Sequence, residues 1–312
     1  MGLLTIYGLL EQNQLWPRAR GDADTLKVSI AGIDRPFRFK PDGKRAAVTK
    51  AFDTAVVRVQ FGSTPVVKNN AVTIRLQGID APELHYDNTT HYRQPYGESA
   101  TLALGALLAS GGEGSLPCRV ETRVESPNDV CDLYARVVGD VIVKLGQRLV
   151  NLNGWLAAQG WAFPAFYTSM SADEIAALTK STEAARAKRK NIWRGYTPQI
   201  GPLDATLKER PKNSAPAPDE GPVIWPKFFR RLVEWQGTGG AGTLSTWLAG
   251  RATEKFVPTD EFLAHGPVSS IQQSLGKSLD AQDRQKFAPK DFVIVEKQST
   301  LKTPEGKAVT GW

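Results

Sequence analysis

The sequence predicts a mainly β fold with packed helices (α+β), a small closed barrel such as an OB-fold, followed by a small C-terminal α+β domain. Short β-rich runs alternate with turn-forming Gly, Pro, Asn and Asp over the first half of the chain. A few amphipathic helical patterns lie among these runs, which is typical of a barrel with helices packed beside it. A Pro-rich polar stretch then separates this part from the rest.

The predicted strands are runs rich in β-branched and aliphatic residues. They are Leu3–Leu10, Thr25–Ile30, Ala55–Phe61, Val72–Ile79, Cys118–Val124 and Tyr134–Val143. The predicted helices of the same part are Glu98–Ala109, Leu149–Gln159 and Ser171–Lys190. The last of these opens with a Ser cap followed by acids and ends in Lys and Arg, which matches the helix dipole.

The composition shifts divide the chain into a barrel domain at residues 1–207, a linker at 208–222 and a C-terminal accessory domain at 223–312. In the accessory domain we expect a helix at Lys227–Trp235 and a strand pair around Asp291–Lys297 and Lys307–Trp312. The aromatic and basic residues around this helix suit a hydrophobic core or a nucleic-acid platform. The domain could also bind a protein partner.

Composition excludes several classes of protein. The 312 residues are 41% hydrophobic and 23% charged, so wholesale disorder is excluded. The 39 Lys and Arg exceed the 32 Asp and Glu, and the net charge of +7 favours a polyanionic partner. With 2 Cys and 3 His, a multi-Cys zinc scaffold and a disulfide-dense mini-domain are both excluded. Cys118 and Cys131 either pair or stay reduced.

We expect no membrane anchor and a cytoplasmic location. The apolar stretches are broken well short of the roughly 18–20 residues that a bilayer requires. The beginning of the sequence alternates like a strand and lacks the basic residues that open a signal peptide. A trimmed leader or a non-classical route of secretion stays open.

The most informative stretch is Val72–Glu83, a predicted strand followed by a turn. Arg75, Asp80 and Glu83 place one guanidinium and two carboxylates within nine positions. Carboxylates suit a hard cation, and a guanidinium fork suits a phosphate. The alternative is an ordinary surface turn.

Two further motifs carry charged residues next to predicted strands. Asp24 opens the strand at Thr25–Ile30, and Arg136 follows a hairpin turn in the sequence Asp132–Arg136. Taken singly, Asp24 is an ordinary turn residue and Arg136 an ordinary surface charge.

Taken together and in this order, the motifs resemble the staphylococcal nuclease (thermonuclease) family over about residues 1–200. The matching elements are Asp22–Thr25, Arg75–Glu83, Tyr96–Ala100, Asp132–Arg136, Val150–Ala162 and Glu183–Trp193. The resemblance implies a five-stranded OB-fold barrel and a Ca²⁺-dependent, sugar-non-specific nuclease that hydrolyses DNA, RNA or both.

The resemblance also implies a role for each matched residue. Asp24 and Asp80 would be carboxylate ligands of Ca²⁺, with the backbone carbonyl of Ala81 completing the set. Glu83 would position or deprotonate the attacking water. Arg75 and Arg136 would bind the scissile phosphate and stabilise the transition state. Tyr134 and Tyr167 would lie beside the substrate.

The chain departs from the family pattern at several points. Ala135 replaces a Gly, so we expect its turn to avoid positive φ. The span between Val28 and Val72 is long and contains Asp53, an alternative to Asp24 as the first metal carboxylate. His85 and His91 lie in an insertion, where we expect solvated side chains rather than metal ligands.

A second hypothesis belongs to a different class of function. The same barrel could bind nucleic acid or a peptide without cleaving it. The charged positions Asp24, Arg75, Asp80, Glu83 and Arg136 are all retained, which favours the enzyme.

Overall fold

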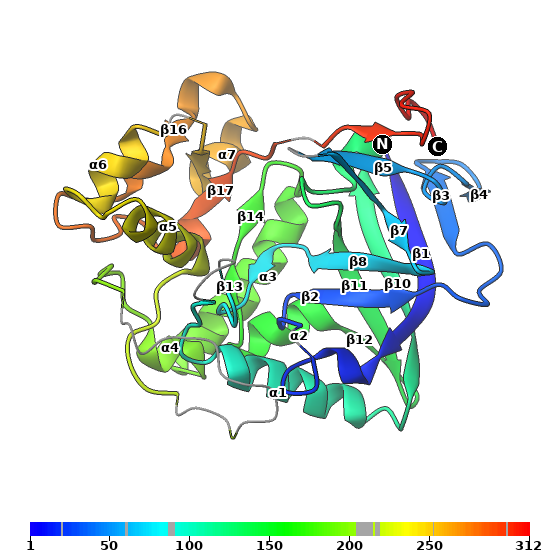
Figure 1. Cartoon of the computed structure of the whole chain (residues 1–312), viewed down its shortest axis with the longest axis horizontal. Helices are drawn as coiled ribbons and strands as arrows, with labels where there is room; N and C mark the ends of the chain where they lie inside the picture. The colour runs from blue at the N-terminus through cyan, green and yellow to red at the C-terminus, as the bar shows by residue number, and fades with distance from the viewer. Residues whose placement is uncertain are drawn as a thin grey trace.

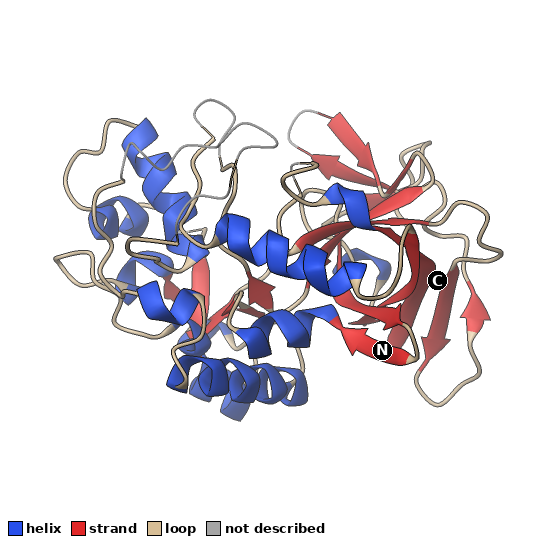
Figure 2. Ribbon diagram, turned by 90° about the horizontal axis from the view of Figure 1, so that it is seen from below, coloured by secondary structure: helices blue, strands red, loops and turns tan. Residues whose placement is uncertain are grey.

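The computed structural model describes the chain except residues 20, 60–61, 87–90, 204–214, 216–218, 252 and 298. The predicted linker at 208–222 therefore lies mostly outside the described residues. Strands gather at one end of the molecule, and the helices of the C-terminal segment lie at the other (Figures 1 and 2). The two chain ends lie close together beside the strands (Figure 1).

The core of the molecule is a closed five-stranded barrel, which confirms the predicted fold class. Its strands, in order around the barrel, are β1 (Gly2–Glu11), β2 (Thr25–Ser29), β8 (Ala71–Leu76), β11 (Val137–Leu145) and β10 (Ser115–Val124). The sheet closes because β10 also pairs with β1. The pair β8–β11 is parallel and the others are antiparallel.

Alternation along the strands fills the barrel. In β1, Leu4, Ile6 and Leu10 are fully buried, whereas Tyr7 and Glu11 face solvent. Side chains of successive strand residues point to opposite faces, so this period-2 pattern places one apolar face inside. Val72 and Ile74 of β8 are likewise fully buried inside the barrel.

The insertion between β2 and β8 adds short strands at the rim of the barrel. They are β3 (Phe37–Pro41), β4 (Ala47–Val48), β5 (Val56–Val59), β6 (Gly62–Pro65) and β7 (Val67–Lys68). The chain end returns to this insertion, because β18 (Leu301–Lys302) pairs with β5 and the Trp312 ring stacks on Phe39 at 4.5 Å between centroids.

Helices cover the barrel and the region next to it. They are α1 (Gly97–Ala109), α2 (Leu152–Gln159), α3 (Ala172–Ala187) and α4 (Ile192–Gly195). Ser171 caps α3 in a reciprocal pair with Glu174, as the sequence predicts. Gly160 ends α2 with a positive φ of 71°, which Gly adopts without steric cost. Three short strands lie nearby: β9 (Ile79–Asp80), β12 (Arg148–Asn151) and β13 (Phe163–Pro164).

The C-terminal segment, from Val223 onward, packs against the region of β13, α3 and α4. It contains α5 (Pro226–Gly237), α6 (Leu244–Ala249), α7 (Thr259–His265), β15 (Lys255–Pro258), β16 (Gln273–Ser274) and β17 (Phe292–Ile294). β17 pairs with β14 (Phe166–Tyr167), which precedes the predicted linker. Trp225 and Phe228 of the segment share one hydrophobic core with Phe163 and Trp193. These contacts fix α5 relative to the barrel.

Two further observations concern the cysteines and the helices. Cys118 and Cys131 are both buried and free. No helix among the described residues is long and apolar enough to cross a membrane.

Candidate active site

A cleft of about 1090 Å³ lies between the barrel and the C-terminal segment. The predicted site residues that line it are Asp24, Arg75, Asp80, Glu83, Tyr134, Arg136 and Tyr167. Lys227, Arg230 and Arg231 of α5 line the facing wall. The remaining predicted residue, Ala81, is buried directly beside Asp80. One cleft therefore collects residues that are far apart in the sequence.

Arg75 joins the two carboxylates that were predicted to bind metal. It lies on β8 opposite Thr25 of β2 and is only 8% exposed. Its Nη1 lies 2.6 Å from Asp24 Oδ2, and its Nη2 lies 2.6 Å from Asp80 Oδ1. Burial alone would lower the pKa of Arg75, but the charges of Asp24 and Asp80 outweigh burial and raise it. Arg75 is therefore a permanently charged bridge.

Asp24, rather than Asp53, is the carboxylate in the cleft. Asp24 directly precedes β2, and its Oδ2 accepts a hydrogen bond from the backbone N–H of Ala81 at 2.7 Å. This bond ties the turn after β9 to the edge of β2. Asp53 is exposed in the turn before β5 and is not among the described residues that line the cleft.

Arg230 of α5 is a site residue that the sequence analysis missed. Its Nη2 donates to Asp80 Oδ2 at 2.9 Å, and its Nη1 donates to Asp80 Oδ1 at 3.2 Å and to Glu83 Oε1. Burial alone would raise the pKa of Asp80, but Arg230 and Arg75 lower it. No local signal could reveal this contact, because Arg230 lies 150 residues after Asp80.

Asp22 adds a fourth carboxylate to the site. Its Oδ1 is buried without a hydrogen-bond partner among the described residues, and His85 Nδ1 lies 3.5 Å away. Burial, followed by the charges of Glu83 and Asp24, raises the pKa of Asp22 well above its ordinary value. The expectation that His85 is merely solvated is wrong, because this histidine folds back onto Asp22.

Carboxylates and cationic side chains lie close together in the site. Burial raises the pKa of Glu83, as do the charges of Asp80 and Asp24, although Arg230 opposes the shift. The guanidiniums of Arg75 and Arg230 pair with three of the four carboxylates. Arg136 and Lys227 add positive charge to the same cleft. The carboxylate oxygens of this donor set are of the kind that a hard divalent cation prefers.

The carboxylates do not form a closed ligand cage as they stand. Within the described part of the chain, no three or more acidic, His or Cys side chains converge closely enough to hold an ion. Guanidinium groups account for this spacing, because Arg75 bridges Asp24 to Asp80 and Arg230 bridges Asp80 to Glu83. The carboxylate oxygens therefore suit a cation, and the guanidinium groups of Arg75 and Arg230 bind them in this structure.

Arg136 also lines the cleft, near the carboxylate of Asp22. Its Nε donates to Asp132 Oδ2 at 2.7 Å, and its Nη1 donates to Thr25 Oγ1 at 3.2 Å. The guanidinium lies over the ring of Tyr134, 5.4 Å from the centroid. Tyr134 itself is 74% exposed, so its ring is accessible to a ligand in the cleft.

The turn before Arg136 contradicts one expectation. Ala135 adopts a positive φ of 61°, although its Cβ makes this conformation costly. Asp132 imposes it: the side chain accepts the backbone N–H groups of Tyr134 and Arg136, and its carbonyl accepts that of Ala135. The hydrogen bonds of this turn outweigh the preference of alanine.

Tyr167 lies on β14 and lines the cleft, whereas its neighbour Phe166 is fully buried. Burial raises the pKa of Tyr167, so its hydroxyl stays protonated and is a hydrogen-bond donor at neutral pH. This geometry is compatible with its predicted place beside a substrate.

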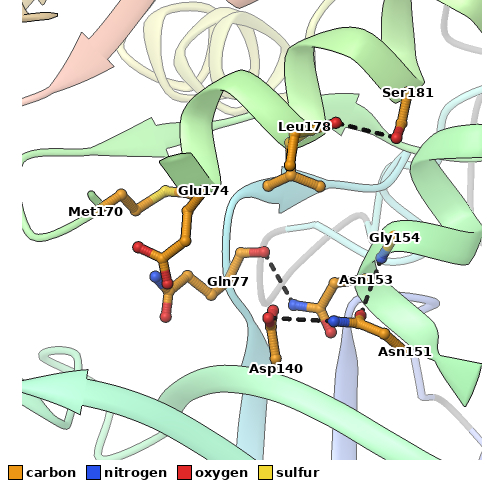
Figure 3. Close-up of a pocket in the computed structure, with 10 residues that line it drawn as sticks. Gln77, Asp140, Asn151, Asn153, Gly154, Met170, Glu174, Leu178 and Ser181 are labelled. Carbon is orange, nitrogen blue, oxygen red and sulfur yellow. Dashed lines mark hydrogen bonds between the residues drawn. The ribbon is translucent and has the colours of Figure 1, made fainter. Parts of the chain in front are cut away.

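A second, smaller cavity of about 160 Å³ lies away from these residues (Figure 3). Polar side chains such as Gln77, Asp140 and Asn153 line it, and no Arg or Lys is among its described lining residues. Asn151 donates to Asp140 at 3.2 Å, and burial raises the pKa of Asp140 to about 6. Without a cation, this cavity does not suit a phosphate.

Comparison with known proteins agrees with the fold. Residues 73–195 match the family model of staphylococcal nuclease homologues, which confirms the resemblance over this part of the chain. No match was found among the curated proteins. The matched residues include Arg75, Asp80, Glu83 and Arg136, whereas Asp24 precedes them and Arg230 follows them. Residues 73–195 therefore belong to a nuclease-type fold, and residues before and after them also line the cleft.

Proposed function

We propose that this nuclease-type domain is a Ca²⁺-dependent phosphodiesterase that hydrolyses strands of DNA, RNA or both. The observation that carries the proposal is the convergence in one cleft of Arg75, Glu83 and Arg136 with the carboxylates of Asp24 and Asp80. Phosphodiester hydrolysis requires a group that activates water and positive charge where the phosphate gains negative charge. The cleft contains both.

The carboxylates supply the metal ligands in this proposal. Asp24, Asp80 and the carbonyl of Ala81 would hold Ca²⁺, which when bound polarises a phosphoryl oxygen. Asp22, whose Oδ1 makes no hydrogen bond among the described residues, adds a further oxygen donor beside them. Carboxylate and carbonyl oxygens suit Ca²⁺ better than they suit a transition metal.

Glu83 would accept a proton from the attacking water. Burial raises the pKa of Glu83, and a carboxylate with a higher pKa is a stronger base in its ionised form. Arg75 and Arg136 would donate hydrogen bonds to the non-bridging oxygens of the phosphate, which gain charge as the water attacks. Tyr134 and Tyr167 would contact the nucleotide beside the scissile bond.

Substitution at Glu83 and Arg75 tests the proposal. We expect Glu83→Gln and Arg75→Ala each to lower the cleavage of single- and double-stranded DNA in Ca²⁺ by at least about a hundredfold. Glu121→Gln is the control, because Glu121 lies on β10 outside the described lining of the cleft and pairs with Arg119 at 2.6 Å. Retained activity in the two cleft variants would remove the proposal.

The outcome with the unaltered chain separates the two classes of function. Tight, salt-sensitive binding of DNA without turnover in Ca²⁺ would favour the non-catalytic binding module, because phosphate contacts alone give a steep salt dependence.

A further inference from the structure

The helix α5 presents two different faces. One face is apolar and is buried in the core that the C-terminal segment shares with Phe163 and Trp193. Its residues are Phe228, Phe229, Leu232 and Val233. The opposite face lines the cleft with Lys227, Arg230, Arg231 and Glu234. Because the apolar face is fixed by packing, the position of Arg230 over the carboxylates is set by the fold.

Arg230 engages the oxygens that a metal ion would use. Its guanidinium bonds both oxygens of Asp80 and one oxygen of Glu83. The side chains of Arg230, Asp80 and Glu83 are only 18%, 1% and 13% exposed, so water screens these contacts weakly. Arg230 also lies outside the residues that match the nuclease family model.

We infer that Arg230 is an internal cation that competes with a bound metal ion for Asp80 and Glu83, and thereby sets the metal affinity of the site. The inference rests on the proposed function, in which Asp80 is a metal ligand. A cation that binds Asp80 either displaces the guanidinium or lies within a few ångströms of its positive charge. Both arrangements weaken metal binding.

The opposite role for Arg230 predicts the opposite sign. If Arg230 instead positions Asp80 and Glu83 for the metal, its removal would weaken metal binding. The direction of the change in affinity therefore separates competition from support, without any measurement of catalysis.

The test is the Ca²⁺ dissociation constant of the full chain, measured by isothermal titration calorimetry. We expect Arg230→Gln to bind Ca²⁺ at least about tenfold more tightly than the wild type, a difference of about 1.4 kcal/mol. Arg251→Gln is the charge-matched control, because Arg251 is 44% exposed and faces Glu234 and Glu254 at 3.6 and 3.7 Å, not Asp80 or Glu83. The control should bind Ca²⁺ within about threefold of the wild type.

A second measurement keeps the test valid if the variant is less stable. Removal of Arg230 leaves buried Asp80 with one guanidinium, so the Tm of Arg230→Gln without Ca²⁺ should fall. The rise in Tm on adding Ca²⁺ should then be larger for the variant than for the wild type. An equal or weaker Ca²⁺ affinity, a smaller rise in Tm, or no Ca²⁺ binding by either protein would overturn the inference.

Cleavage by the wild-type chain distinguishes this failure from that of the proposed function. Ca²⁺-dependent cleavage with unchanged affinity in Arg230→Gln would leave the function standing and remove only the competition. Tighter binding in the variant with no cleavage by any form would support the competition and remove the function.

Discussion

Arg136 offers the sharpest single substitution, because the structure separates its supporting contacts from its proposed task. Two of its donors, Nε and Nη1, hold it to Asp132 and Thr25. A guanidinium has five N–H donors, so these two bonds leave about three for a phosphate in the cleft. Arg136→Ala removes them all while leaving β11 intact.

The two consequences of this substitution differ greatly in size. The ion pair with Asp132 is partly exposed, so its loss should lower the free energy of unfolding by no more than about 1 kcal/mol. Loss of a donor that acts on the transition state costs about 3–4 kcal/mol, or about 10² to 10³ in kcat. We therefore expect a large fall in kcat with a small change in Tm.

The assay is the steady-state cleavage of a DNA oligonucleotide in Ca²⁺, with kcat and KM determined separately. Asp132→Asn keeps the guanidinium but weakens its support, so the loss in kcat should be smaller. Arg119→Ala is the matched control, because Arg119 lies on β10 in a similar ion pair with Glu121 at 2.6 Å and does not line the cleft.

The control should keep kcat within about twofold of the wild type, since surface ion pairs contribute little. The account of Arg136 is refuted if Arg136→Ala keeps more than about a tenth of the wild-type kcat. An equal loss in Arg119→Ala would also refute it, because the effect would then follow from charge alone.

Three further predictions concern stability and reactivity. Ala135→Gly should raise the free energy of unfolding by about 1 kcal/mol, because glycine adopts the positive φ of 61° without strain; denaturation in urea measures this, and a decrease would contradict it. Burial raises the pKa of Asp140 from 3.8 to about 6, so the folded protein keeps a proton that the unfolded chain loses, and stability falls as the pH rises through this range. Asp140→Asn keeps an acceptor for Asn151. Its free energy of unfolding should exceed that of the wild type by about 1–2 kcal/mol at pH 7 and should equal it at pH 3.5. Denaturation in urea at both pH values measures the difference, and an equal gain at pH 3.5 would contradict the prediction. Burial raises the pKa of Cys118 to about 12 and raises that of Cys131 as well, so neither thiol should react with a disulfide reagent at pH 8 until the chain is unfolded; rapid reaction of the native protein would show that these residues are accessible.

The sequence predicts the barrel well because its signals are local. Alternation of apolar and polar residues within each strand specifies both the strand and its buried face, as in β1 and β8. The preference for Asp24 over Asp53 also rests on a local signal, since Asp24 lies in the motif Asp22–Thr25 that opens the strand β2.

The features that the sequence analysis did not predict depend mainly on contacts between distant parts of the chain. Arg230 was part of a basic and aromatic helix pattern, but only tertiary packing brings it to Asp80. The pairing of β14 with β17 is equally invisible to local patterns, because Phe166 and Val293 are joined only in the folded state. At Ala135, hydrogen bonds of the turn override a residue preference that the sequence alone suggests.

The most direct test of the central claim is cleavage of single- and double-stranded DNA by the purified full-length chain with Ca²⁺, with Mg²⁺ and with EDTA. The account predicts cleavage that requires Ca²⁺ and is abolished by the chelator. Absence of cleavage by folded protein with either metal, or cleavage that persists in EDTA, would contradict it.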